Sequence, residues 1–254
     1  MDWASIRFTW MYAKSQLRLK YRYTALGVLW NVLEPLLYLG LLSIVFSYVN
    51  RMHLSDYAVF LFSALVPWRY FEKVVSGCTD AIVQGDWLLK KLPASPFSLP
   101  LARWIFASVE FGFSFAAVGL ILLLVKDNWT VHVVVLPLSA LPWAMTALGV
   151  GLCCATLFTF FRDVRPIVQN VLMFAFFTAP ILFTPDLFPS GSAQARLLAW
   201  HPLTYFAGLF QKPVYAGRWP APMDWAVASA TAGAALALGI ASVRGARARL
   251  YFYL

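Results

Sequence analysis

Charged residues are scarce in this sequence. Asp, Glu, Lys and Arg make up 12% of its 254 residues, whereas 61% are hydrophobic. A soluble domain carries about 25% charged residues. Too few polar side chains remain here to cover a surface in water. The composition therefore excludes an ordinary soluble protein and indicates a chain whose solvent is mostly lipid.

The sequence also lacks the motifs of nucleotide binding and hydrolysis. It contains no GxxxxGKS/T phosphate loop and no HExxH, GxSxG or CxxC pattern, so it has no motif for binding ATP in that way. Its three cysteines lie in or beside apolar runs, which favours small core residues over a disulfide framework. The three histidines are far apart along the chain and do not favour a metal site. They are His53, His132 and His201.

Long apolar runs are what the sequence has in quantity. A helix needs about 20 apolar residues to cross roughly 30 Å of hydrocarbon. The runs are continuously apolar rather than alternating, which favours helices over membrane strands. We therefore predict an all-α integral membrane protein. Its six spanning helices are expected at 26–49, 57–77, 104–125, 131–160, 166–184 and 224–243. The fourth run holds Pro137 and Pro142, so we expect it to kink or break there.

Basic residues are unevenly distributed between the segments that connect these runs. With six spans both termini share a side, and that side carries thirteen basic residues against five on the other. Because cytoplasmic segments are enriched in Lys and Arg, both termini are predicted to be cytoplasmic. Topology and contact with lipid headgroups thus explain the net charge of +9, and nucleic acid is not an expected partner. The thirteen are Arg7, Lys14, Arg18, Lys20, Arg22, Lys90, Lys91, Arg103, Arg162, Arg165, Arg244, Arg247 and Arg249, and the five are Arg51, Lys126, Arg196, Lys212 and Arg218.

Residues 1–23 are predicted to form an amphipathic helix on the membrane surface, ahead of a six-span domain at 24–254. Basic residues fall largely off the apolar stripe, as is typical of an interfacial helix. An ordinary juxtamembrane anchor is the alternative. The stripe consists of Trp3, Ile6, Trp10, Ala13, Leu17 and Tyr21.

The loop at 78–103 is predicted to contain a short amphipathic helix. Gly85-Asp86 is a helix start with Asp86 as its cap, and Pro93 and Pro96 end the helix. A helix held between two spans can dock into a groove on a partner protein. A plain connecting loop is the alternative. The candidate docking residues are Asp86, Trp87, Leu88, Leu89, Lys90, Lys91 and Leu92.

The external segment 185–222 is too interrupted to span the membrane. Two apolar patches, 197–200 and 203–210, meet at His201-Pro202. We expect two short re-entrant helices here, because irregular backbone at membrane depth must be buried in protein or line a cavity. An exposed loop is the alternative.

Small residues in the sixth run predict close helix packing. Ala226, Ala230 and Ala234 are spaced by four residues, as are Ala235 and Gly239. Small side chains at that spacing let two helix backbones approach each other closely.

Five ionisable side chains lie at the predicted depth of the membrane. Each costs about 2.5–3.5 kcal/mol at the centre of a spanning helix on insertion scales, so we expect them to face one another, a partner or water. They are Glu34, Arg69, Glu72, Lys73 and Glu110. Two interpretations are open: lining of a transport pathway, and structural pairing of Glu34 or Glu110 with Arg69.

Aromatic residues alternate with the charges of the second run. Trp68, Tyr70 and Phe71 interleave with Arg69 and Glu72. Aromatic faces beside hydrogen-bonding groups suit sugar rings, which are apolar on one face and hydroxylated at the rim. Trp68 and Tyr70 therefore join the ionisable residues as candidates for lining a glycan pathway.

A proline follows the first of these charges, in the pair Glu34-Pro35. Proline within a spanning helix frees a backbone carbonyl group and bends the helix axis. We therefore expect the first span to bend and to line a lateral opening.

Taken in order, these segments resemble the membrane permeases of type-2 ABC exporters. The branch that exports polysaccharide, such as O-antigen, capsule or teichoic acid, is the most similar. The resemblance covers nearly the whole chain. It rests on the stretches LKYRYTALGVLWNVLEPLLY, LFSALVPWRYFEKVVSGCTDAIVQGDWLLKKLPASPFSLPLAR, FRDVRPIVQNVLMFAFFTAPILF and HPLTYF. One departure is that the family usually has Asn before the late Pro-Leu, where this chain has His201.

The resemblance implies a homodimer in the bacterial inner membrane, with two ATPase subunits docked below it on the coupling helix at 86–92. ATP and Mg would bind to the ATPase, and this chain would carry no cofactor. The substrate would be a glycan on a polyprenyl diphosphate carrier. Arg18, Lys20 and Arg22 are candidates for contact with that diphosphate, although topology signals explain them as well. The segment 185–222 would sit at the exit.

Other functions remain open at this stage. An ABC permease for another substrate, such as teichoic acid, lipid or a drug, would share the same architecture. A membrane-embedded enzyme acting on lipid-linked sugars would need catalytic groups clustered at one face, whereas the polar residues look scattered along the sequence. A purely structural scaffold does not explain charges inside the spans.

Overall fold

The structure is a computed structural model that describes residues 3–22, 26–91, 95–125, 131–184, 187–189 and 191–253. These residues form helices and connecting turns, and no strand occurs among them. The elements are α1 (Trp3–Tyr21), the 3-10 helix η1 (Gly27–Leu29), α2 (Trp30–Val49), α3 (Leu54–Thr79), α4 (Ala81–Gln84), α5 (Asp86–Lys91), α6 (Ser98–Val125), the 3-10 helix η2 (Val131–Val135), α7 (Leu136–Phe160), α8 (Val164–Thr178), α9 (Ala193–Trp200), α10 (Pro202–Val214) and α11 (Pro222–Tyr253).

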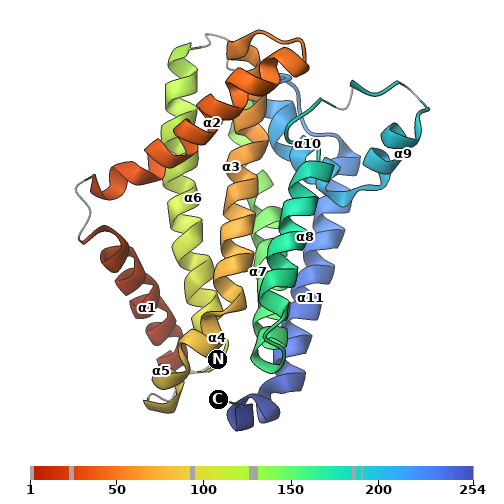
Figure 1. Cartoon of the computed structure of the whole chain (residues 1–254). Coiled ribbons are helices and arrows are strands. Elements are labelled where there is room, and N and C mark those ends of the chain that lie inside the picture. The colour runs from red at the N-terminus through yellow and green to blue at the C-terminus, as the bar shows by residue number, and fades with distance from the viewer. Residues whose placement is uncertain are drawn as a thin grey trace.

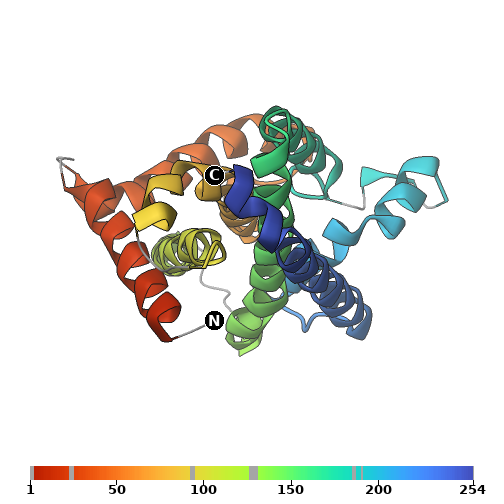
Figure 2. The same ribbon diagram turned by 90° about the horizontal axis from the view of Figure 1, so that it is seen from below.

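The long helices form one bundle. Helices α3, α6, α7, α8 and α11 run along one another, and α2 crosses them obliquely (Figure 1). The start of α1, the pair α4–α5 and the end of α11 gather at one end, whereas α9 and α10 lie toward the other. Figure 2, seen from the α4–α5 end, shows α1 and α9 on opposite flanks of the bundle.

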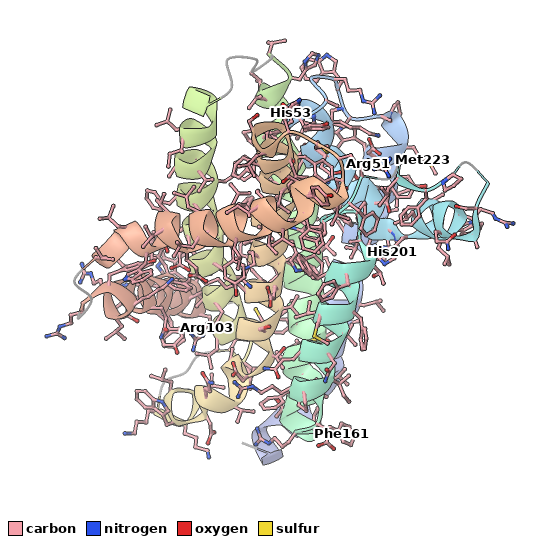
Figure 3. The ribbon with its side chains drawn as sticks, turned by 45° about the horizontal axis from the view of Figure 1, so that its top comes forward. Arg51, His53, Arg103, Phe161, His201 and Met223 are labelled. Carbon is pink, nitrogen blue, oxygen red and sulfur yellow. The ribbon has the colours of Figure 1, made fainter. Side chains whose placement is uncertain are left out.

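Side chains distributed along the chain mark the two ends of this bundle. His53, His201 and Met223 lie toward the end that carries α10, and Phe161 lies at the opposite end (Figure 3). The connections after α2 and before α11 therefore share one end, and the α7–α8 turn lies at the other.

A helix occupies each of the six predicted apolar runs. Four segments are long and apolar enough to cross a membrane, namely 30–49, 98–121, 131–160 and 222–246. The helix α8 is apolar but only 15 residues long. The helix α3 has 26 residues but carries four ionisable side chains. The chain is thus an all-helical, multi-pass membrane protein.

Prolines lie in two of these helices. The fourth run begins as the 3-10 helix η2 and becomes α-helical at Leu136, with Pro137 in the first turn of α7. Proline suits that position because its missing N–H would have no intrahelical partner there. Pro142 lies inside α7 and Pro35 inside α2.

The helix α3 is the centre of the core. It packs against α2, α6, α7, α8 and α10. Tyr57, Phe62 and Leu65 of α3 are buried, and Phe206 and Phe210 of α10 join them in one hydrophobic cluster. Arg69, Glu72 and Lys73 lie on the side of α3 that remains accessible, where they are 36%, 39% and 42% exposed.

Small residues bring α7 and α11 into close contact. A Cβ atom built on Gly149 would lie 2.3 Å from the backbone carbon of Ala235, and one on Gly239 would lie 2.4 Å from the backbone oxygen of Gly149. The packing prediction for Ala235 and Gly239 is therefore confirmed.

The other predicted row of small residues on α11 is wrong. Ala226, Ala230 and Ala234 are exposed, whereas Ala228 and Ala232 are buried. Alanine is so frequent in this helix that spacing alone does not identify the face that packs.

The helix α1 keeps most of its apolar stripe away from the bundle. Trp3 and Trp10 are 78% and 61% exposed, whereas Ser5, Thr9 and Ala13 are buried. The buried side packs against α6. Two stripe residues are exceptions, because Ala13 lies on the edge that meets the bundle and the Tyr21 hydroxyl reaches Asn31 and Glu110. The aromatic stripe is thus available to lipid, as expected of an interfacial helix.

His201 begins α10. Its Nδ1 atom accepts a hydrogen bond of 3.2 Å from the backbone N–H of Leu203, and Pro202 takes the first helical position. An N-cap side chain satisfies a backbone donor that has no partner within the helix. Asn also serves well at that position, so the departure of His201 from the resembling family preserves the cap.

Candidate substrate cavity

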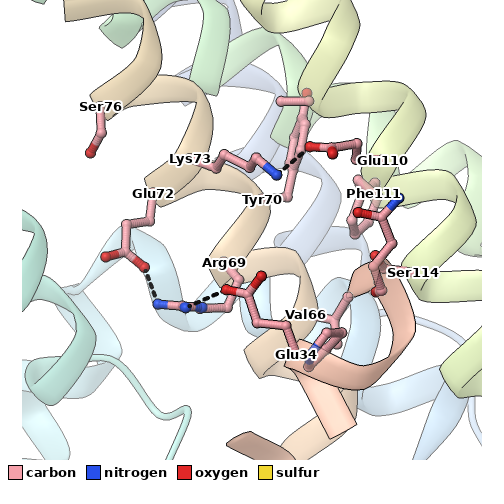
Figure 4. A pocket seen from close by; sticks show the side chains of 13 residues that line it. Glu34, Val66, Arg69, Tyr70, Glu72, Lys73, Ser76, Glu110, Phe111 and Ser114 are labelled. Atoms are coloured by element: carbon pink, nitrogen blue, oxygen red, sulfur yellow. Dashed lines mark hydrogen bonds and ion pairs between the residues drawn. The ribbon is translucent and has the colours of Figure 1, made fainter. Parts of the chain in front are cut away.

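A cavity of about 450 Å³ lies between α2, α3 and α6. Glu34 and Asn31 of α2, Arg69 and Lys73 of α3, and Glu110 of α6 are among the residues that line it (Figure 4). Polar groups that look scattered along the sequence are therefore gathered on one cavity. The expectation of dispersed polar residues is wrong, because it rests on sequence distance and these three helices pack side by side.

Glu34, Arg69 and Glu72 form one group, here called the Arg69 triad. The guanidinium Nη2 atom lies 3.3 Å from Glu34 Oε1, and Nη1 lies 3.0 Å from Glu72 Oε2. The guanidinium also stacks over the ring of Tyr38, 4.4 Å from its centroid. The three charged side chains are 57%, 36% and 39% exposed, respectively. The triad is thus ion-paired and still accessible.

Glu110 organises a second group, here called the Glu110 cluster. Its carboxylate accepts hydrogen bonds from Lys73 and, at 2.6 Å, from Lys20. The Tyr21 hydroxyl lies within hydrogen-bond distance of both Glu110 and Asn31 Oδ1. Glu110 is only 3% exposed. A buried carboxylate needs this degree of pairing, and the pairing ties α1 to α2, α3 and α6. The expected alternative pair of Glu110 with Arg69 is not the one formed.

The carbonyl group opposite Pro35 in α2 has a specific partner on α6. Proline has no N–H, so the carbonyl oxygen of Asn31 loses its helical hydrogen bond. The hydroxyl of Ser114 on α6 donates to that oxygen at 2.6 Å. This contact satisfies the freed carbonyl group and attaches α2 to α6 beside the cavity. Neither Asn31 nor Ser114 is a sequence candidate, although the position of Asn31 four residues before Pro35 is a usable signal.

The two aromatic candidates have different positions. Tyr70 lines the cavity, and its hydroxyl lies 2.9 Å from Ser108 Oγ. Trp68 is buried beside Phe71 and Phe176, where it lines a separate small hollow. Trp68 therefore does not line this cavity. Consecutive helical residues point about 100° apart, so an interleaved pattern does not place all its members on one face.

Lys20, one of the three candidate diphosphate contacts, joins the Glu110 cluster. Its ammonium group is 2.6 Å from Glu110. Arg18 and Arg22 are exposed at the end of α1. The three residues therefore do not form one site within the described part of the chain.

The predicted docking helix is α5. Trp87 is 59% exposed, and Lys91 lies over its ring. Asp86 lies in the first turn and pairs with Lys90 at 2.7 Å, whereas Leu88 and Leu89 are half-buried. Leu92 lies outside the described residues. This helix therefore presents an indole and two ammonium groups on its accessible side.

Gly85 fixes where α5 begins. A Cβ atom at this position would lie 2.3 Å from Cδ1 of Leu99, a fully buried residue of α6. Glycine lets the turn between α4 and α5 approach α6. The sequence identifies Gly85 as a helix start, but this packing role depends on a residue fourteen positions away.

Metal binding has no support in the parts of the chain that the structure describes. No group of three or more His, Cys, Asp or Glu side chains is arranged there to hold a metal ion. The carboxylates of the cavity are instead engaged by cationic side chains.

Comparison with known proteins decides the family. No family model matches the chain. It is 30% identical to the O-antigen export system permease protein RfbA of Myxococcus xanthus over 206 residues, which cover 81% of this chain and 79% of that protein. The chain belongs to the polysaccharide-export permeases of type-2 ABC exporters. This permease is also 27% identical to an RfbA of Klebsiella pneumoniae over 68% of its length and 67% of the relative's. It is 22% identical to the polysialic acid transport protein KpsM of Escherichia coli, over 80% of its own length and 79% of that protein's.

Membership of this family changes the interpretation of the cavity. In a transport permease, a polar cavity between membrane helices is a candidate substrate contact rather than a catalytic centre. The pairing of each carboxylate in this cavity with a cation agrees with that interpretation.

Proposed function

We propose that this chain is the membrane permease subunit of an ABC transporter that exports a lipid-linked, O-antigen-type polysaccharide across the bacterial inner membrane. The similarity to an O-antigen export permease over four-fifths of the chain carries the proposal. The polar cavity within an otherwise apolar helical bundle supports it.

The energy for export comes from a partner in this proposal. The chain has no phosphate-loop motif, so ATP and Mg bind to two separate ATPase subunits, and the permease itself carries no cofactor. The exposed Trp87 on α5 is the proposed anchor, with Asp86, Lys90 and Lys91 around it. The contact of Gly85 with α6 gives this coupling helix a firm base from which a movement can reach the bundle.

The proposed topology has six spans, with α3 and α8 added to the four helices that qualify by length and composition. Both termini, α4 and α5 are cytoplasmic, and α9 and α10 form the external re-entrant pair. The distribution of basic residues and the grouping of these segments at the two ends of the bundle (Figure 1) support this arrangement.

A second copy of the chain completes the proposed pathway. Glu34, Arg69 and Glu72 are each more than a third exposed, and charges at membrane depth are costly against lipid. A second copy, with a water-filled path between the two, gives these groups a polar surrounding. A homodimer in which the Arg69 triad faces the path is the arrangement we propose.

The carrier's diphosphate belongs at the membrane surface in this proposal. Arg18 and Arg22 are exposed at the end of α1, and Trp10 and Ile6, at least two turns earlier in the same helix, are available to lipid. Basic side chains beside a lipid-facing stripe suit a diphosphate joined to a polyprenyl chain. Lys20 is less available for this contact because it is bonded to Glu110.

Association with an ATPase tests the proposal. The chain is co-expressed with an ATPase subunit encoded beside it, and Trp87→Cys is used for crosslinking to that subunit. Trp219→Cys is the matched control, because Trp219 is 56% exposed and lies before α11 at the opposite end. We expect crosslinks from position 87 alone. Failure of the two proteins to co-purify, or equal crosslinking from both positions, would reject the proposal, and activity on lipid-linked sugars without any ATPase would favour an enzyme.

A further inference from the structure

We propose that the cavity between α2, α3 and α6 selects uncharged, hydroxyl-rich sugar rings and disfavours anionic glycans. This inference rests on the proposed function, because it assumes that the exported glycan passes this cavity. It goes further by assigning a charge class to the sugar. The relatives do not settle that choice, since one of them is named for polysialic acid transport.

Among the described residues, the Arg69 triad retains free acceptor oxygens on its two carboxylates, beside three N–H groups of Arg69 that the ion pairs do not use. Arg69 uses one nitrogen on Glu34 Oε1 and another on Glu72 Oε2. The second oxygen of each carboxylate forms no hydrogen bond with the described residues, and both side chains are more than a third exposed. Carboxylate oxygens accept hydrogen bonds only. A ligand group that meets them must therefore donate, as a sugar hydroxyl does.

The charge of the cavity opposes an anion at this position. Three carboxylates line the cavity against the cations Arg69 and Lys73, which leaves one net negative charge on the lining. Lys20 balances that charge, but it does so at Glu110, where it and Lys73 share one carboxylate. An anionic ligand beside Glu34 and Glu72 would meet two carboxylates and a single guanidinium shared between them.

The remaining walls suit the apolar face of a sugar ring. Pro35, Val66, Ala107 and Phe111 line the cavity. Tyr70 contributes its ring, because its hydroxyl is already bonded to Ser108. Sites for small molecules typically enclose about 300–1,000 Å³ and combine apolar walls with a few polar groups. The cavity of about 450 Å³ falls within that range.

Binding of one neutral probe and one anionic probe of equal length tests the inference. The full chain is purified in lipid nanodiscs, and saturation-transfer difference NMR, which detects weak binding, is recorded with mannotetraose and with a tetramer of sialic acid. We expect the wild-type chain to favour mannotetraose by at least about fivefold, the equivalent of one net hydrogen bond.

Two paired variants identify the groups responsible. Glu34→Gln with Glu72→Gln removes the negative charge and keeps the size of the side chains, while one acceptor oxygen of each becomes a donating NH2 group. The preference for mannotetraose, expressed as a free energy, should therefore fall by at least about half. Glu34→Ala with Glu72→Ala should weaken mannotetraose binding by about fivefold. Asp80→Asn removes an ion-paired carboxylate outside the cavity and should leave both signals unchanged.

Three results would overturn the inference: absence of mannotetraose binding, equal or stronger binding of the sialic acid tetramer, or an unchanged preference in the glutamine variant that elutes as a single monodisperse species. A chain that crosslinks to its ATPase through position 87 but gives any of these results retains the proposed function and loses the charge selectivity. Loss of the ATPase contact would instead reject the proposed function itself.

Discussion

The two charged groups of the cavity both pair carboxylates with basic side chains, but they differ in how far their carboxylates are buried. The Glu110 cluster surrounds a carboxylate that is 3% exposed, whereas Glu34 in the Arg69 triad is 57% exposed. Lys20 and Tyr21 of α1 and Lys73 of α3 all engage Glu110, whereas Arg69 is the one partner of Glu34 among the described residues. Pairing around a buried group positions helices, whereas pairing around an accessible group leaves hydrogen-bonding capacity for a ligand. We therefore expect Glu110 to act mainly on stability and Glu34 mainly on export.

Replacement of Glu110 should have the largest effect on stability. Glu110→Ala leaves Lys20 and Lys73 without their shared partner, and we expect a loss of about 2–3 kcal/mol. The value is below that of a fully buried pair because these lysines remain 33% and 42% exposed. Thermal unfolding in detergent measures the change. Equal stabilities of this variant and Glu34→Ala would remove the distinction between the two groups.

Replacement of Glu34 should act on transport instead. Glu34→Leu removes one partner of an accessible ion pair, so the free energy of unfolding should change by less than about 1 kcal/mol. We expect insertion to be preserved and export to fall by about tenfold, which corresponds to ~1.4 kcal/mol. Surface glycan and dimer yield are measured together. Normal glycan export at normal dimer yield would contradict this assignment.

Loss of the Ser114 hydroxyl tests the hydrogen bond that attaches α2 to α6 beside the cavity. Ser114→Ala leaves the Asn31 carbonyl group without a donor and should cost about 1 kcal/mol. Pro35→Ala restores a backbone N–H that can donate to the same oxygen. In that background Ser114→Ala should cost less than about half as much. A double-mutant cycle with no coupling between the two positions would show that the proline-freed carbonyl group is not what Ser114 stabilises.

A change at Gly85 should leave both charged groups intact. Gly85→Ala places a methyl group against the buried Leu99 side chain and displaces α5. We expect the amount of ATPase retained on purification to fall by about twofold to fivefold, the equivalent of ~0.4–1 kcal/mol. Sugar binding to the cavity serves as the internal control and should not change. Unaltered ATPase retention would show that the base of α5 does not set its docking geometry.

His201 should produce the smallest effect, and one that depends on pH. Burial lowers the pKa of its imidazole, and the neutral ring accepts the hydrogen bond that caps α10. In the unfolded chain the imidazole has a pKa of about 6.5 and binds a proton more readily. The stabilisation that the neutral imidazole contributes is therefore present above about pH 6.5. It decreases as the pH falls below that value toward the lower pKa of the folded state.

A substitution that cannot titrate isolates this contribution. His201→Asn keeps a cap acceptor, so it should lose a few tenths of a kcal/mol at most at neutral pH. It should also flatten the dependence of thermal stability between pH 7.5 and about pH 5. Identical pH profiles for wild type and variant would contradict the capping role of the imidazole.

Run length and local signals predicted the helices, and helix faces were harder to predict. The six apolar runs correspond to helices, and Gly85 and His201 mark helix starts that the structure contains. Trp68 was misplaced because α3 is apolar on nearly every side. The row at Ala226 was misplaced because small residues surround the whole of α11. Periodicity identifies a buried face only where polar residues mark the opposite face.

The composition of the cavity depends on contacts that no local pattern contains. Lys20 reaches Glu110 across 90 positions of sequence, and Ser114 reaches Asn31 across 83. The ionisable residues were recognisable individually because charge is costly in a membrane. Which of them would be buried and which would remain accessible depended on the packing of α1 and α2 against α3 and α6.

ATP-driven glycan movement tests the central claim most directly. The permease and its ATPase are reconstituted in proteoliposomes with a lipid-linked glycan, and a lectin outside the vesicles measures glycan that has crossed the bilayer. The account predicts movement that requires the permease, the ATPase and ATP together, and that falls by about tenfold in Glu34→Leu. Movement by the permease alone, or full movement in Glu34→Leu at equal ATPase content, would contradict it.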